Sequence, residues 1–99
     1  MVRRGRFETA LDRLKSAKTS LRCQEVASLL ESLGFEVRDG RRGGHKVFIH
    51  DHISGFTSGS YNCEHGRNPE IKRPYVKKVL AVLRQHEQEL KRYLEKRNE

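Results

Sequence analysis

One short segment of the chain, residues 41–45, brings together residue types that suit a reaction on a phosphate ester. It reads Arg-Arg-Gly-Gly-His. Glycines let the backbone approach another molecule closely, arginines attract phosphate, and an imidazole takes or gives a proton near neutral pH. RNA supplies the matching reactant, because its 2′-hydroxyl is a nucleophile beside the phosphate and needs only a base and charge stabilisation. The segment therefore indicates His45 as a general base, with Arg41 and Arg42 near phosphate. The alternative is that His45 is a plain polar position on a strand.

A second feature is the concentration of positive charge in residues 67–84. These residues carry six lysines and arginines against Glu70 alone, a surplus of five in a chain whose net charge is +8. An ordinary charge run is the solvated face of a helix. This one lies beside an expected helix start, where free backbone N–H groups also attract anions. We expect phosphate contacts from four of its side chains: Lys72, Arg73, Lys77 and Lys78.

A third group offers nitrogen and sulfur ligands. His50, His52, Cys63 and His65 are residue types that hold zinc in tetrahedral geometry, although their spacing matches no standard zinc finger. A zinc-stabilised interaction domain is therefore an alternative reading. Cys23 falls on the apolar stripe of an expected helix and is predicted to fill the core.

Helical periodicity occurs at both ends of the chain. Apolar residues recur every three or four positions from Phe7 to Lys18 and again over residues 21–33, with Ser20 as N-cap and Gly34 as C-cap. A third helix begins near Pro74, a residue suited to the first helical turn, and runs to Tyr93 or beyond. His86 on this helix is expected to face solvent.

The middle of the chain has the alternating pattern of strands. Strands are predicted over residues 35–39, 45–50 and 60–63, with glycine-rich turns between them. The order is thus α-α-β-β-β-α. It predicts an α+β fold in which a three-stranded antiparallel sheet carries the helices on one face.

Length and composition exclude a membrane-spanning protein, a secreted disulfide-rich protein and a large multidomain enzyme. The chain has 99 residues, enough for one domain, and 34% of them are apolar. Its longest apolar run is residues 79–83, too short to cross a bilayer, and the basic N-terminus meets no apolar stretch, so no secretory signal is expected. Two cysteines do not make a disulfide scaffold, and a cytoplasmic location is the simplest expectation.

Three segments, taken together and in order, resemble the HicA (YcfA-like) family of toxins. They read LLESLGF (29–35), RGGHKVF (42–48) and KRPYVKKVL (72–80), and the resemblance runs from about Arg22 to Leu83. It implies a fold similar to a double-stranded-RNA-binding domain and the activity of an mRNA interferase in a type II toxin–antitoxin system. It also implies ribosome-independent RNA cleavage by a histidine and inhibition by a HicB-type antitoxin.

The chain departs from the family motif at two positions. The motif usually reads Gly, then Ser or Thr, then one or two histidines, whereas Gly44 replaces the hydroxyl residue and Lys46 stands where a second histidine often falls. If one histidine suffices, His45 is the base and Lys46 meets the phosphate. If the second is required, the protein is a non-catalytic RNA- or DNA-binding module.

The predicted organisation is one domain over residues 1–99. Residues 1–20 form an N-terminal helical extension, residues 21–94 the HicA-like core and residues 95–99 a frayed tail. No cofactor or membrane partner is expected. RNA would lie across the turn at residues 41–46 and the start of the last helix.

Overall fold

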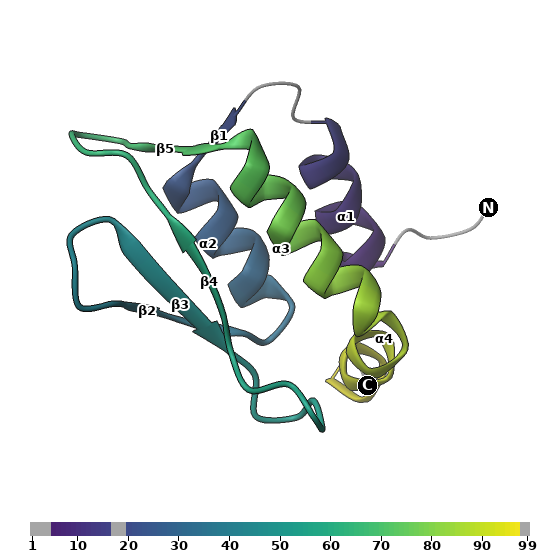
Figure 1. The fold of residues 1–99 in the computed structure, drawn as a ribbon. Helices are drawn as coiled ribbons and strands as arrows, with labels where there is room; N and C mark the ends of the chain where they lie inside the picture. Colours follow the sequence, from purple (N-terminus) through teal and green to yellow (C-terminus); the bar gives the residue numbers. More distant parts are fainter. Residues whose placement is uncertain (1–4, 17–19, 98–99) are drawn as a thin grey trace.

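The computed structural model describes residues 5–16 and 20–97 of the chain, and Figure 1 shows the arrangement of its elements. In chain order these are α1 (Arg6–Ser16), β1 (Ser20–Arg22), α2 (Cys23–Ser32), β2 (Glu36–Asp39), β3 (His45–Ile49), β4 (Gly59–Asn62), β5 (Glu70–Lys72), α3 (Arg73–Gln85) and α4 (Glu87–Arg97). The predicted end of the first helix, at Lys18, lies outside the described residues.

The central sheet has the predicted α+β architecture. Its three antiparallel strands are ordered β2-β3-β4, with Val37 opposite Phe48 and His45 opposite Asn62. Helices α2 and α3 lie together on one face of this sheet (Figure 1). The alternation of strand side chains sends Phe48 and Tyr61 toward the helices, where both are buried, and leaves Asn62 exposed. The predicted fold class is confirmed.

A second sheet of two short strands was not predicted. Strand β1 pairs antiparallel with β5, and the facing residues Leu21 and Ile71 are both buried. Ser20 therefore belongs to a strand and does not cap α2, so that prediction is wrong. The N-cap is Arg22, which makes no side-chain cap hydrogen bond, and the first N–H of the helix, on Cys23, donates to the Pro69 carbonyl at 2.8 Å.

The C-terminus of α2 follows the prediction. Gly34 has a φ of +93°, the left-handed conformation that glycine adopts without strain. Its N–H donates to the Glu31 carbonyl at 3.0 Å, and the N–H of Phe35 donates to the Leu30 carbonyl at 3.1 Å. This pair of bonds satisfies carbonyls that the helix end would leave free, and it directs the chain into β2.

The predicted last helix is two helices. α3 ends at Gln85, His86 has non-helical angles (φ −111°, ψ 24°), and α4 continues to Arg97, so residues 95–97 are helical rather than frayed. The bend lets α4 cross the end of α3 and pack against α1 (Figure 1). Leu90 and Leu94 are buried there, as predicted. His86 is not a solvent-facing residue, because its ring packs edge-on against Phe56 with centroids 5.3 Å apart.

The two cysteines form a disulfide, which the sequence did not lead us to expect. Cys23 and Cys63 are both buried, as core filling requires, and their Cα atoms are 5.8 Å apart. The bond joins the first turn of α2 to the residue that follows β4. Within residues 5–16 and 20–97, every helix is too short or too polar to cross a membrane.

Candidate active site

His45 is the first residue of β3, at the mouth of the β2–β3 turn. The turn is closed by two backbone hydrogen bonds, from the Gly40 N–H to the His45 carbonyl at 2.8 Å and from the His45 N–H to the Arg42 carbonyl at 3.1 Å. Gly40 lies directly against the imidazole, and a Cβ atom at this position would overlap the ring. These two hydrogen bonds therefore fix the backbone position of His45 at the end of the hairpin.

Gly44 has a conformation that a residue with a side chain adopts only with strain. Its φ is +84°, and its carbonyl accepts a hydrogen bond of 2.6 Å from the N–H of Cys63. A Cβ atom at residue 44 would run into the Cys63 carbonyl oxygen. A serine or threonine does not fit this conformation without strain, so glycine is the residue that this turn requires.

The side chain of His45 is held by a hydrogen-bonded chain of three residues. Its Nδ1 lies 2.8 Å from Oδ1 of Asn62, and Nδ2 of Asn62 donates to the Tyr75 hydroxyl at 3.0 Å. An amide oxygen only accepts, so Nδ1 of His45 carries the proton. In the neutral ring Nε2 is then the unprotonated nitrogen, which is the state a general base needs.

The same chain joins three elements. Asn62 is the β4 residue directly opposite His45 in the sheet, and Tyr75 belongs to the first turn of α3. Lys78 lies three residues after Tyr75, one turn further along the helix and on the same side of it. The imidazole and the basic start of α3 are therefore brought together through two hydrogen bonds.

An open groove of about 690 Å³ surrounds His45. The β2–β3 turn contributes Arg41 and Arg42, whose side chains are exposed, and the segment after β4 contributes Cys63 and His65. Guanidinium groups at the edge of a groove attract a phosphodiester, and two arginines can each donate to its oxygens. The groove thus combines a proton acceptor with fixed positive charge.

Lys46 is separated from this groove. It follows His45 on β3 and so points to the opposite face of the sheet, where it lines a second hollow with Ala27 and Glu31 of α2. Its ammonium group pairs there with Asp39. The structure therefore does not bring Lys46 together with His45, contrary to the expected shared phosphate contact.

The four cations at the start of α3 are not among the residues that line the groove. Lys78 lies on the side of α3 that carries Tyr75, whereas Arg73 and Lys77 lie on the other side of the helix. Lys72 is 3.5 Å from Glu64, on the segment that follows β4. Arg73, Lys77 and Lys78 are exposed on the first two turns of α3. Together with Arg41 and Arg42 they give two basic borders, one on the β2–β3 turn and one on the helix.

The proposed zinc ligands are not brought together. His50 and His52 follow β3 at the end of the sheet near α4, whereas Cys63 and His65 follow β4 at the opposite end. Cys63 is bonded to Cys23, and the described part of the chain holds no group of three or more side chains that could bind a metal. The zinc-domain alternative is therefore wrong for these residues.

His50 is a core residue. Its Nε2 lies 3.0 Å from the Leu33 carbonyl and its Nδ1 accepts from the His52 N–H at 3.1 Å, so the ring is neutral. Burial lowers the pKa of His50; the bond to Leu33 works against this shift, the His52 charge adds to it, and the Asp51 charge opposes it.

Sequence reasoning missed the partners of His45. Asn62 is 17 positions from His45 in the sequence, and Tyr75 is 13 positions further on from Asn62. The available signal was the strand register, because a predicted β3–β4 hairpin places an Asn close to His45. His65 also lines the groove, but the sequence pattern indicated it only as a possible zinc ligand.

Comparison with known proteins gives no relative. No family model, no curated protein and no solved structure matches this chain.

Proposed function

We propose that this chain is an endoribonuclease that uses His45 as its general base. The observation that carries the proposal is the hydrogen-bonded chain from His45 through Asn62 to Tyr75, which places the proton on Nδ1 and leaves Nε2 as the unprotonated nitrogen of a ring that lines the groove. The resemblance to HicA toxins in three segments, one of which contains His45, supports the same activity.

The reaction follows from the chemistry of RNA. Nε2 of His45 accepts the proton of the 2′-hydroxyl, and O2′ attacks the adjacent phosphorus. The bond from phosphorus to the 5′-oxygen breaks, which leaves a 2′,3′-cyclic phosphate and a 5′-hydroxyl end. Asn62 keeps the imidazole oriented while Arg41 and Arg42 offset the charge that develops on the phosphate oxygens. DNA lacks the nucleophile and is not a substrate.

Substrate positioning comes from the two basic borders. Lys77 and Lys78 of α3 and the arginines of the β2–β3 turn are exposed and meet phosphates on either side of the scissile bond. Contacts of this kind read backbone shape and charge. We therefore assign Lys72, Arg73, Lys77 and Lys78 to binding and leave the chemical step to the groove.

The resemblance extends the proposal to a toxin–antitoxin pair. The toxin is an mRNA interferase, and its partner is a HicB-type antitoxin protein that blocks the RNA surface. Expression of the chain alone in a bacterial host should slow growth and fragment transcripts, and the His45→Ala variant should do neither. Unchanged growth and intact transcripts with the wild type would count against the toxin role.

The cleavage assay uses a long labelled RNA in the presence of a chelator. His45→Ala should cleave about 10²–10⁴ times more slowly than wild type, the usual loss for a general base. His52→Ala is the matched control, because His52 is an exposed histidine near α4, away from the groove. Equal cleavage by wild type and His45→Ala would refute the assignment. RNA binding without cleavage by the wild type would identify a non-catalytic module.

A further inference from the structure

The groove around His45 contains a second histidine, from a different segment of the chain. His65 lies three residues after the end of β4, and it lines the groove together with Arg41, Arg42 and His45. We propose that His65 is the general acid of the reaction, which protonates the 5′-oxygen as it leaves. This inference rests on the proposed ribonuclease function and adds a second catalytic residue to it.

The segment that carries His65 is anchored on several sides. Cys63 donates its N–H to Gly44 in the β2–β3 turn at 2.6 Å and is bonded through sulfur to Cys23 of α2. The next residue, Glu64, donates its N–H to the Glu70 carbonyl at 2.9 Å and pairs with Lys72 at 3.5 Å. The β2–β3 and β4–β5 turns project at the same end of the molecule (Figure 1). His65 is therefore held next to the turn that precedes His45.

The other groups in the groove cannot supply the proton. The guanidinium groups of Arg41 and Arg42 stay charged at every physiological pH, and the sulfur of Cys63 is in a disulfide. Lys46, beside His45 in sequence, is on the opposite face and pairs with Asp39. Among the residues that line the groove, His65 is the side chain other than His45 that carries an imidazole, the group most often used to transfer protons in enzymes.

The step balances with two imidazoles and no other reactant. Nε2 of His45 takes the proton from the 2′-hydroxyl, and the new bond from O2′ to phosphorus forms as the bond to the 5′-oxygen breaks. The protonated ring of His65 gives its proton to the departing 5′-oxygen. His45 ends protonated and His65 neutral, so a proton exchange with water restores both for the next turnover.

The test compares two substrates of one sequence. The first is an ordinary RNA oligonucleotide, and the second replaces the bridging 5′-oxygen at the cleavage site with sulfur. A thiolate leaves without a proton, so the second substrate does not need a general acid. Full-length wild type, His65→Gln and His45→Gln are assayed on both, with His52→Gln as the control for loss of an exposed histidine.

We expect His65→Gln to lose at least about 10²-fold on ordinary RNA and less than about 10-fold on the sulfur substrate. His45→Gln should lose activity on both, because the 2′-hydroxyl still needs its base. The pH profile of kcat/KM should be bell-shaped for ordinary RNA and should lose its alkaline limb with the sulfur substrate.

Each other outcome has a definite meaning. Equal losses of His65→Gln on the two substrates would identify a phosphate-binding residue and overturn the acid assignment, as would full activity on ordinary RNA. Failure of the wild type to cleave either substrate would instead reject the proposed function. Because His65 is exposed, the variant should keep the wild-type unfolding temperature, which separates a catalytic loss from a folding defect.

Discussion

The hydroxyl groups of Tyr61 and Tyr75 have opposite surroundings. Tyr61 is 1% exposed, and its hydroxyl has no hydrogen-bond partner among the described residues. Burial raises the pKa of Tyr61 to about 12. The Tyr75 hydroxyl, in contrast, accepts from Asn62 and so supports the orientation of His45. The Tyr61 hydroxyl therefore lowers the stability of the fold, whereas the Tyr75 hydroxyl helps to orient the site.

Removing each hydroxyl should therefore have a different effect. Tyr61→Phe should raise the free energy of unfolding by about 1 kcal/mol, because it removes an unpaired buried polar group, and should leave cleavage unchanged. Tyr75→Phe should reduce kcat by roughly 2–10-fold, the equivalent of one hydrogen bond, with little change in KM. Chemical denaturation and initial rates measure both effects. A drop in stability for Tyr61→Phe, or wild-type kcat for Tyr75→Phe, would contradict this assignment.

Residue types alone identified part of the site. His45, Arg41 and Arg42 were predicted from the chemistry of their side chains and lie in one groove. Lys46 was placed with them because it is adjacent in sequence, but neighbours on a strand face opposite sides. Asn62 was not predicted, because its role depends on the strand register.

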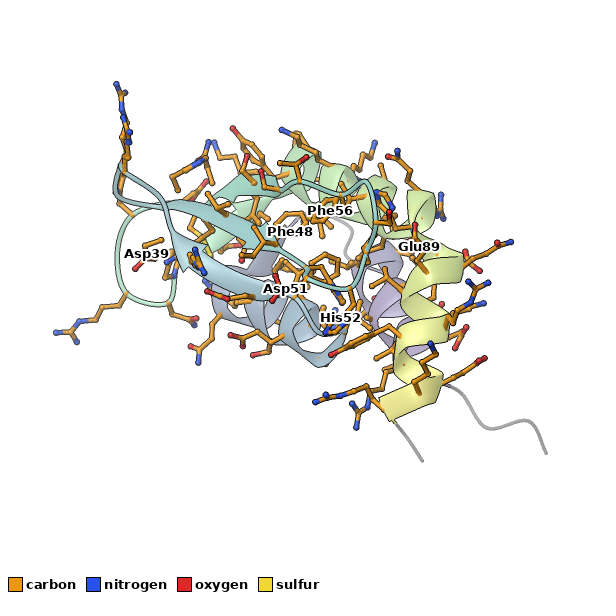
Figure 2. The ribbon with its side chains drawn as sticks, turned by 90° about the horizontal axis from the view of Figure 1, so that it is seen from below. Asp39, Phe48, Asp51, His52, Phe56 and Glu89 are labelled. Atoms are coloured by element: carbon orange, nitrogen blue, oxygen red, sulfur yellow. A yellow bond between two sulfur atoms is a disulfide. The ribbon has the colours of Figure 1, made fainter. Side chains whose placement is uncertain are left out.

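At the scale of elements, one buried histidine joins three of them. His50 follows β3, bonds the carbonyl of Leu33 at the end of α2, and packs edge-on against Tyr93 of α4 with ring centroids 4.7 Å apart. In Figure 2 the loop after β3, with Asp51, His52 and Phe56, lies beside α4 and Glu89. The N–H of Ser54 donates to Glu89 at 3.0 Å, which ties this loop to α4 a second time.

This junction should make stability depend on pH. Burial lowers the pKa of His50 below its ordinary value of 6.5, so between the two values the unfolded chain binds the proton more readily. The free energy of unfolding should be highest above about pH 6.5, fall as the pH drops below it by at most about 1.4 kcal/mol per pH unit, and level off below the lowered pKa.

Urea denaturation at a series of pH values measures this dependence. His50→Gln keeps a side-chain N–H for the Leu33 carbonyl but does not titrate. The free energy of unfolding should therefore fall less steeply with decreasing pH in the variant than in the wild type, between the lowered pKa of His50 and about pH 6.5. His52→Gln keeps the buried ring and should keep most of the slope. The same slope in wild type and His50→Gln would show that other groups set the acid sensitivity.

The periodic helices and the three strands of the central sheet were predicted, whereas the two three-residue strands and the bend at His86 were not. The stripe with Val26 and Leu30 identified α2, and alternation identified β2 and β3. Strands β1 and β5 have three residues each, so they contain no full period, and they form only because distant segments meet. The break at His86 was missed because no Gly or Pro marks it and the apolar stripe continues to Leu90.

At the scale of the whole molecule, the histidines of the groove and the buried His50 lie at opposite ends of the sheet. Figure 2 shows Asp39, beside the β2–β3 turn, far from Asp51 and His52 near α4. The turn and the start of α3 carry the exposed cations of the site. The opposite end packs α4 against α1, where Lys91 bridges Glu8 at 3.1 Å and Glu87 at 2.9 Å. The positive charge that we propose to meet RNA is therefore local, although the net charge belongs to the whole chain.

This locality predicts how RNA affinity depends on salt. Each cation that neutralises a phosphate of single-stranded RNA contributes about 0.7 to the slope of log K against log salt concentration. Lys77→Ala with Lys78→Ala should therefore reduce the magnitude of the slope by about 1.4. Arg92→Ala with Lys96→Ala removes the same charge from exposed positions on α4 and should leave the slope unchanged, because a Debye length of about 8 Å at physiological salt screens distant charges.

Binding is measured with an uncleaved RNA whose 2′-hydroxyls are methylated, over 50–300 mM salt, so that cleavage does not distort the affinity. Equal slope changes for the two double variants would mean that affinity follows net charge and not the surface at the start of α3. That outcome would show that α3 is not part of the RNA interface. The role of the groove around His45 would still be tested by the cleavage assay. A reduction confined to Lys77 and Lys78 would fix the path of the RNA, because the hydrogen bond from Asn62 to Tyr75 connects that part of α3 to the imidazole.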